Sequence, residues 1–259
     1  MGILTRLRHS RPVGLARYHL YRDVMLAWPR RCACNICGWR GRRFLTSGHH
    51  AFTLCPCCGS RIRHRLIAAA LTRHPIATRV PLESGRVLHV SPEYCLSLVL
   101  RPRARNYVRA DWATSDCDVR QDITRMPFRD GAFDVVIACD TLEHVADDRL
   151  AVQECRRVLA PGGITILTVP QSDEAYATYE DRTLISPEDR AATYGQHDHV
   201  RNYGADFANR VASEGFRVTC VDASSFDADY GAAHVLRPPV RAQDPWGWND
   251  RRVYFAERA

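Results

Sequence analysis

The sequence predicts an α/β fold with a doubly wound, mostly parallel sheet, preceded by a small cysteine-rich lobe. Two observations carry this prediction. From residue 85 onward, short apolar runs alternate with segments of helical periodicity, which is the pattern of parallel strands joined by helices. Before residue 80 the chain is instead strongly basic and has clustered cysteines. We therefore expect an N-terminal lobe over residues 1–80 and a main domain over residues 81–259.

Apolar runs in the main domain predict strands at residues 86–90, 106–110, 133–139, 164–169, 216–221 and 252–257. Helical patterns occupy residues 94–100, 147–159 and 206–214. The second helix is ended by the Pro-Gly-Gly run at 161–163, and the third by Gly215. Ligands of such sheets bind beyond the carboxyl ends of the strands. The functional residues are therefore expected in the segments that follow the strands.

Charge is unevenly distributed along the chain. All 36 basic residues are arginines, which excludes a Schiff-base lysine and a phosphate loop of the Walker A type. Residues 1–80 contain 15 arginines and the single acid Asp23, a net charge of +14, whereas residues 81–259 contain 21 arginines and 28 acids, a net charge of −7. This asymmetry indicates two parts with different roles.

Membrane insertion and secretion are not expected. The sequence has no uninterrupted apolar stretch of the length that spans a bilayer, and its basic N-terminus lacks the apolar segment of a secretory signal. We therefore expect a cytoplasmic protein. The isolated cysteines of the main domain then read as reduced, buried apolar side chains.

Four cysteines of the lobe have the spacing of a metal site. Cys34 and Cys37 form one C-x2-C pair, Cys55 and Cys58 form a second, and a glycine follows each pair. Two such turns can close on one tetrahedral ion, and glycine allows the chain to turn away without a Cβ clash. The spacing predicts structural Zn²⁺ in a zinc-ribbon-like lobe. Iron remains an alternative, and the spare thiols of Cys32 and Cys57 leave open a shifted ligand set.

A helix is predicted directly after the second cysteine pair, with Ser60 as its N-cap. Its apolar positions form one stripe at helical spacing, comprising Ile62, Leu66, Ile67, Ala70 and Leu71. Three arginines lie off this stripe, Arg61, Arg63 and Arg65. One interpretation is an anion-binding patch for RNA or a phosphorylated substrate. The other is a helix face without a ligand, which is either solvated or packed as a seam against the acidic main domain. We favour the second interpretation. A further helix is predicted at 12–28 and a linker at 74–85.

The central part of the main domain carries a family resemblance. The run from Asp122 to Val145, with Asp-Thr-Leu-Glu-His-Val at 140–145, and the Arg-Arg-Val-Leu-Ala-Pro-Gly-Gly run at 156–163 resemble class I S-adenosylmethionine-dependent methyltransferases over residues 85–259. The run from Tyr194 to Tyr203 and the cysteine lobe resemble a subset of uncharacterised bacterial and plant members. The resemblance implies a seven-strand, Rossmann-like sheet and S-adenosyl-L-methionine as cofactor.

The resemblance also implies roles for residues at the strand ends. Asp111 would accept hydrogen bonds from the ribose hydroxyls, with Trp112 beside it. Asp122 would bind the adenine amino group, and Ile123 would supply backbone and apolar contact. The remaining contacts are expected from Asp140 and Thr141, bordering the sulfonium and substrate, and from the first turn, Val90, Ser91, Pro92 and Glu93. That turn lacks the glycines usual in the family, and Glu93 is expected to replace the missing acid near the cofactor's ammonium group.

Three histidines are candidates for a general base, since histidine titrates near neutral pH. His144 follows the fourth predicted strand, and its alternative role is packing or a hydrogen bond at a helix start. His197 and His199 flank Asp198 in a segment expected to cover the strand ends, with Arg201 as an anion clamp. A metal site at these two histidines and a loop-ordering role remain open.

Two other features are expected near the substrate. The segment 171–196 is rich in tyrosine and acids and is expected to form part of the substrate wall. Trp246 and Trp248 either stack on a ring of the substrate or pack internally. We expect methyl transfer to a hydroxyl or amine of a small molecule, such as a sugar or a specialised metabolite. The alternatives are an RNA or protein methyltransferase that grips its substrate with the basic lobe, and a non-catalytic cofactor-binding module.

Overall fold

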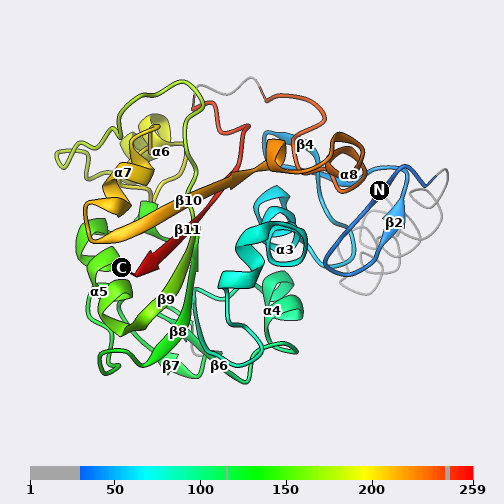
Figure 1. The fold of residues 1–259 in the computed structure, drawn as a ribbon. Helices are drawn as coiled ribbons and strands as arrows, with labels where there is room; N and C mark the ends of the chain where they lie inside the picture. Colours follow the sequence, from blue (N-terminus) through cyan, green and yellow to red (C-terminus); the bar gives the residue numbers. More distant parts are fainter. Residues whose placement is uncertain (1–29, 115, 243–245, 259) are drawn as a thin grey trace, which may run out of the picture.

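The computed structural model describes residues 30–114, 116–242 and 246–258 (Figure 1). The helix predicted at 12–28 lies outside these residues. The main domain is built on a seven-stranded sheet with the order β10-β11-β9-β8-β5-β6-β7. Its strands are β5 (Arg86–Val90), β6 (Asn106–Asp111), β7 (Val119–Arg120), β8 (Phe133–Cys139), β9 (Leu159–Thr168), β10 (Phe216–Asp222) and β11 (Arg252–Arg258).

Strand directions confirm the predicted fold class. The pairs β5–β6, β5–β8, β6–β7 and β8–β9 are parallel, and β11 runs antiparallel to both β9 and β10. The prediction for β9 was too short, because the strand already begins at Leu159. Its Pro-Gly-Gly run forms an irregularity in the pairing with β8, where the register moves from Phe133–Leu159 to Val135–Ile164.

Helices cover both faces of the sheet, as Figure 1 shows. Helices α3 (Ile62–Arg73) and α4 (Tyr94–Leu100) pack on one face, and α5 (Asp148–Val158) and α7 (Phe207–Ala212) pack on the other. Alternate strand residues serve the two cores, since Val87 packs with the α3 side and Leu88 with the α5 side. Two shorter helices, α6 (Pro187–Tyr194) and α8 (Ala228–Ala233), lie in the connections.

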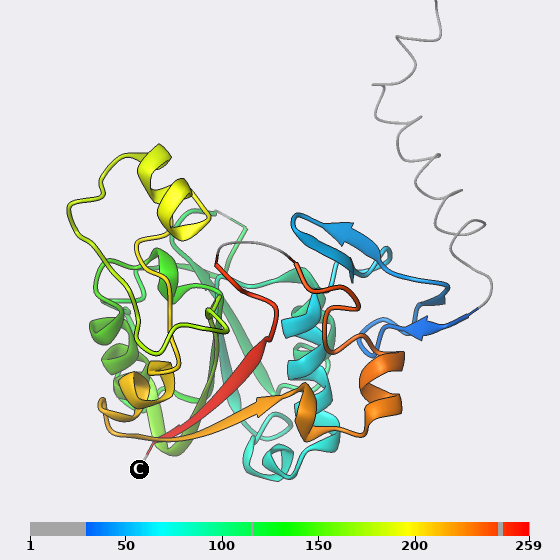
Figure 2. The ribbon, with the colours of Figure 1, turned by 90° about the horizontal axis from the view of Figure 1, so that it is seen from above.

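The cysteine lobe, residues 30–60, consists of two small hairpins. Strand β1 (Cys32–Ala33) pairs with β2 (Arg40–Gly41), and β3 (Leu45–Ser47) pairs with β4 (His50–Leu54), both antiparallel. Figure 2 shows this lobe beside α3 and α8. The segment predicted as a linker is folded against the sheet: it contains the 3₁₀-helix η2 (Pro75–Arg79), and Ile76, Val80 and Leu82 are buried in the α3-side core.

Arg65 joins the cysteine lobe to the main domain. Its side chain is fully buried and donates hydrogen bonds to the backbone oxygens of Thr53, Ser60, His234 and Val235 over 2.8–3.0 Å. The guanidinium also lies 4.3 Å from the ring centroid of Phe44. Of the two interpretations of the arginines on α3, a seam between the two parts therefore describes Arg65.

The start of α3 differs from the prediction. The helix begins at Ile62 with Arg61 in the cap position, so Ser60 is not the N-cap. Ser60 is buried, and its hydroxyl lies 3.2 Å from the Cys34 thiol. The hydroxyl is therefore used by the cysteine lobe instead of the helix. None of the helices in the described part of the chain combines the length and the apolar character needed to cross a bilayer.

Candidate functional site

The structure brings together the four cysteines predicted as metal ligands. The Sγ atoms of Cys34, Cys37, Cys55 and Cys58 all lie within 4.8 Å of one another. Two of these separations, Cys34–Cys58 and Cys37–Cys55, are 3.7 Å. A tetrahedral site with Zn–S bonds of about 2.3 Å has an edge of about 3.8 Å, whereas a disulfide needs about 2.05 Å. The arrangement fits a tetrahedral metal ion.

The two spare thiols of the lobe lie outside this group. Cys32 contacts the backbone oxygen of Gly41 at 3.4 Å, and Cys57 is exposed. The glycines after each pair, Gly38 and Gly59, have φ angles of 74° and 71°. This left-handed conformation is the reason that glycine is needed at both positions.

A cavity of about 340 Å³ lies between the cysteine lobe and the carboxyl ends of β8 and β9. We call it the central cavity. The lobe contributes the β3–β4 hairpin, and α3 contributes its first residues. The main domain contributes the segments after β8 and β9 and the region before β11. The polar side chains that matter below are Arg61, Arg63, Asp140, Glu143, His144 and Arg251.

Two carboxylates beside this cavity are neutralised by arginines. Arg63 lies 2.6 Å from Glu93 and 3.1 Å from Asp140, and Arg251 also pairs with Asp140. His64 donates a 2.6 Å hydrogen bond to Glu93. Burial opposes ionisation of Glu93, but Arg63 and His64 outweigh it and lower its pKa to about 2. Burial likewise opposes ionisation of Asp140, and Arg251 and Arg63 lower its pKa. The ion pairs of Arg63 therefore hold the start of α3 against the main domain.

The turn after β5 is tight despite its lack of glycine. Ser91 has a φ of 47° and donates a backbone hydrogen bond of 2.9 Å to Ala110 at the end of β6. Two buried atoms near this turn, Glu93 Oε2 and His89 Nε2, have no hydrogen-bond partner among the described residues. Burial lowers the pKa of His89 to about 4, so its ring is neutral at pH 7. Both are therefore buried polar atoms that the described residues leave unsatisfied.

Asp111 lies where the prediction requires, at the carboxyl end of β6. Its Oδ1 accepts hydrogen bonds from the amides of Ala113 and Thr114 at 2.7 and 2.9 Å. Together with Pro92 it lines a second cavity of about 370 Å³. The neighbouring indole of Trp112 is 63% exposed. An oriented carboxylate and an exposed ring thus lie side by side at this strand end.

The second predicted acid and its neighbour follow β7. Asp122 accepts hydrogen bonds from the amide and hydroxyl of Thr124 at 2.8 and 2.7 Å. Ile123 is buried and belongs to the α5-side core. Neither residue lines the second cavity.

Two of the three candidate histidines lie together, and one of them, His144, lines the central cavity. His144 and His199 have ring centroids 4.8 Å apart, and their ligand atoms and that of Glu143 lie within 4.8 Å of one another. We call Glu143, His144 and His199 the Glu143 cluster. His197 is not part of it, because its side chain is 74% exposed and only approaches Asp198, at 4.0 Å.

Burial sets the charge states of this cluster. Burial, and then His144, lower the pKa of His199 to about 4. Burial, and then the charge of Asp140, raise the pKa of Glu143 well above its ordinary value. Sequence analysis did not single out Glu143. The feature of the sequence that could have pointed to Glu143 is its position directly before His144, in a run that follows a buried strand.

Arg201 contacts the backbone next to the cluster instead of binding an anion. Its guanidinium donates to the backbone oxygens of Leu142, Val145 and Ala146 and pairs with Glu180. The side chain is only 2% exposed. The prediction of an anion clamp was therefore wrong, since these contacts within the protein use the donors. Arg201 fixes the backbone on either side of Glu143 and His144.

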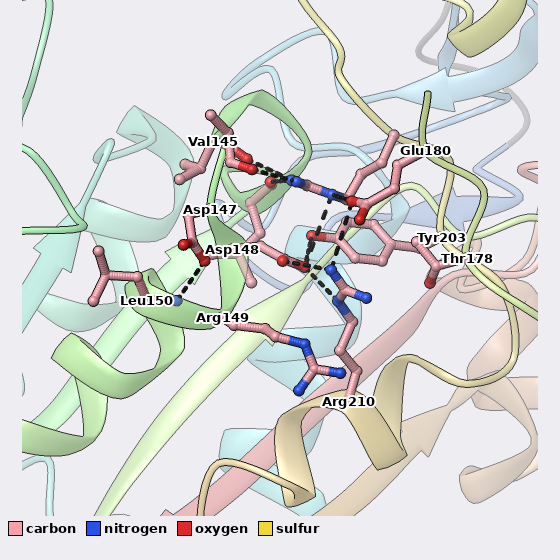
Figure 3. A network of polar contacts seen from close by, with 12 residues as sticks. Val145, Asp147, Asp148, Arg149, Leu150, Thr178, Glu180, Tyr203 and Arg210 are labelled. Atoms are coloured by element: carbon pink, nitrogen blue, oxygen red, sulfur yellow. Dashed lines mark hydrogen bonds and ion pairs between the residues drawn. The ribbon is translucent and has the colours of Figure 1, made fainter. Parts of the chain in front are cut away.

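Further contacts join the same two segments. Val200 donates a 2.9 Å backbone hydrogen bond to Glu143. Asp148 accepts from the hydroxyl of Tyr203 at 2.8 Å and pairs with Arg210 at 2.7 Å (Figure 3). Two motifs far apart in the sequence are thereby locked together.

The two tryptophans pack against each other, and Trp248 also lines the central cavity. Trp246 and Trp248 stack with centroids 5.4 Å apart. They donate hydrogen bonds to Thr193 O and Asn202 Oδ1. A Cβ atom on Gly195 would come within 2.4 Å of Trp248, so this glycine permits the close packing. From the segment 171–196, Gly195 and Gln196 line the central cavity, whereas Tyr176 and Tyr179 are exposed and are not among its lining residues.

Comparison with known proteins identifies the fold family. The family described as a methyltransferase domain matches residues 89–167, which run from β5 to β9. Residues 89–167 therefore form a methyltransferase domain, and the chain is similar to the class I S-adenosylmethionine-dependent methyltransferases. The chain is 28% identical over 179 residues to a probable tRNA methyltransferase 9B of Mus musculus, covering 62% of the chain and 38% of that relative.

Two other similarities are of the same order. The chain is 32% identical over 154 residues to an uncharacterised 37.1 kDa protein in transposon TN4556 of Streptomyces fradiae, covering 58% of the chain and 42% of that relative. It therefore spans less than half the length of these two curated relatives. A solved S-adenosylmethionine-dependent methyltransferase from Mesorhizobium loti is 15% identical with a TM-score of 0.48, covering 74% of this chain and all of that one.

The chemistry of two strand-end carboxylates is compatible with S-adenosylmethionine. Asp111 has one oxygen held by amides, and a carboxylate of this kind can accept hydrogen bonds from hydroxyl donors. Glu93 Oε2 is buried without a partner in the described chain, and it can accept a hydrogen bond from an ammonium group. When bound, S-adenosylmethionine supplies an activated methyl group. The unusual first turn is therefore compatible with binding it.

Proposed function

We propose that this methyltransferase transfers a methyl group from S-adenosylmethionine to a hydroxyl or amine of a small molecule bound in the central cavity. The observation that carries the proposal is the Glu143 cluster, of which Glu143 and His144 line that cavity, next to Asp140 at the carboxyl end of β8. Side chains that can accept or donate a proton thus lie beside the strand end where the cofactor is expected. The volume, about 340 Å³, suits a small ligand.

The protein's contribution to methyl transfer is mainly alignment. The displacement needs the attacking atom, the methyl carbon and the sulfur in line, and such positioning contributes up to about 7–11 kcal/mol. Asp111 and Glu93 would orient the cofactor, and the Glu143 cluster would receive the acceptor. The arginine pairs of Asp140 hold the strand end in one conformation. A sugar or a specialised metabolite is the acceptor class that we favour.

RNA as the acceptor has less support in this chain. Of the three arginines that lie off the apolar stripe of the helix, Arg63 and Arg65 are used in contacts within the protein. Arg61 remains exposed at the central cavity. Because Arg63 and Arg251, which also line this cavity, are paired with carboxylates, Arg61 fits an anionic group of a small ligand better than the several phosphate contacts of an RNA site.

We further propose that the four lobe cysteines hold structural Zn²⁺. Support comes from the separations of 3.7 Å and from the closed set of four ligands, which leaves no position for a substrate. The ion would keep the two hairpins together at the edge of the central cavity. Its role is therefore to position the lobe residues His49 and His50 that line the cavity.

Labelled cofactor tests the proposed activity. The full chain is incubated with methyl-labelled S-adenosylmethionine and cell extract, and label is expected in the small-molecule fraction. Label in the RNA or protein fraction would overturn the substrate class, and cofactor binding without any labelled product would support a binding module. Asp111→Ala is expected to weaken cofactor binding by at least tenfold in calorimetry, with the surface variant Asp130→Ala as control. An unchanged affinity for Asp111→Ala would remove the ribose role.

A further inference from the structure

The Glu143 cluster combines the side chains of a cation site. Glu143 and His144 belong to the 3₁₀-helix η3 (Leu142–His144) after β8, and His199 comes from the segment before α7. One ligand atom from each lies within 4.8 Å of the other two. Two imidazoles and a carboxylate are a common ligand set for divalent transition metals that keep open coordination positions.

Both histidines are oriented so that Nε2 is left for a ligand. Nδ1 of His199 donates to the backbone oxygen of Tyr194 at 3.2 Å. Nδ1 of His144 lies 3.1 Å from Asp198 Oδ2, and its Nε2 lies 4.0 Å from Glu143 Oε1. A metal-bound histidine typically donates its other ring N–H to a carbonyl or carboxylate, which fixes the tautomer and orientation. Here each histidine has one such partner.

The cluster also contains buried atoms that lack a partner. Glu143 and His199 are each 1% exposed, and Glu143 Oε2 and His199 Nε2 have no hydrogen-bond partner in the described part of the chain. Leaving such a group unsatisfied costs about 1–3 kcal/mol. A bound cation would satisfy both atoms at once.

The charges around the cluster suit a divalent cation. The neighbouring Asp140 is neutralised by Arg63 and Arg251. Arg201 pairs with Glu180 and binds backbone oxygens of the cluster's own segment. Two carboxyl groups, those of Glu143 and Asp198, lie next to the imidazoles, and the ion pairs that both form among the described residues are with histidines.

We propose that Glu143, His144 and His199 bind a divalent cation such as Mn²⁺, with open positions that face the central cavity. Ligand atoms around an ion of this size lie about 3 Å apart, so binding would draw the three side chains together. The partly exposed His144 has room for this movement. Resting on the proposed function, the inference selects a hydroxyl as acceptor, because hard cations prefer oxygen ligands.

Mn²⁺ titration of the zinc-loaded full chain tests the proposal, with free Mn²⁺ followed by electron paramagnetic resonance. We expect one Mn²⁺ site, at least tenfold weaker in His144→Ala. Asp198→Asn is expected to weaken binding by about tenfold or more, the usual effect of losing an outer partner. His197→Ala is the matched control, because this exposed neighbour lies outside the cluster, and its affinity should change less than twofold.

Absence of bound Mn²⁺, or equal losses in His144→Ala and His197→Ala, would overturn the cation site. His144 is 35% exposed, so its alanine variant is expected to fold, which circular dichroism checks. Failure of the two proposals can be distinguished. Mn²⁺ binding without methyl transfer to any acceptor would leave the cation site and remove the activity. Full methyl transfer by protein that binds no Mn²⁺ would remove the cation site and leave the proposed activity.

Discussion

Replacing Arg65 by methionine should detach the cysteine lobe from the main domain. Four backbone oxygens, those of Thr53, Ser60, His234 and Val235, accept hydrogen bonds from this one buried guanidinium. Each would lose its charged donor in Arg65→Met. An unsatisfied buried acceptor costs about 1–3 kcal/mol, and we use the lower end because removing a buried charge recovers part of its desolvation cost. The expected loss is about 4 kcal/mol, a large share of a typical 5–15 kcal/mol.

The measurement is urea unfolding of the zinc-loaded chain, together with its thermal midpoint. For a chain of this size, about 4 kcal/mol corresponds to a fall in Tm of roughly 8–16 °C. Arg73→Met is the matched control on the same helix, since Arg73 is exposed and lies 4.3 Å from the ring centroid of Tyr230. It should lose no more than about 1 kcal/mol. If Arg65→Met costs no more than this control, Arg65 does not join the two parts.

Two further predictions concern Glu93 and the thiol cluster. Because the pKa of Glu93 is lowered from its ordinary 4.5 to about 2, its contribution to stability is fully present above pH 4.5 and is lost as the pH falls toward 2. Glu93→Gln should therefore destabilise the chain at pH 7 by up to about 3 kcal/mol and match the wild type near pH 2 in chemical unfolding; a difference independent of pH would contradict this. Elemental analysis should find about one zinc per chain at the four-thiol site, lost in Cys34→Ser but retained in Cys32→Ser; equal zinc in the two variants would reassign the ligands.

Patterns that depend only on neighbours along the chain could be read before the structure. The strands β5 and β8 follow from short apolar runs, and the Cys34–Cys37 and Cys55–Cys58 pairs follow from their spacing and the glycines after them. The two-residue strand β7 left no such signal, because a run of Val119 and Arg120 has no periodicity to detect.

The sequence by itself determined the fold class, the four-thiol group and the strand ends at which Asp111 and Asp140 lie. Only the tertiary structure decided that Arg65 and Arg201 are buried and that Glu143 joins His144 and His199. The physical reason is that an arginine's partners, and the ring nitrogen that a histidine leaves free, depend on residues far away in the sequence. The backbone oxygens that bind Arg201 are 55–59 positions distant, and one that binds Arg65 is 170 positions distant. No local pattern contains that information.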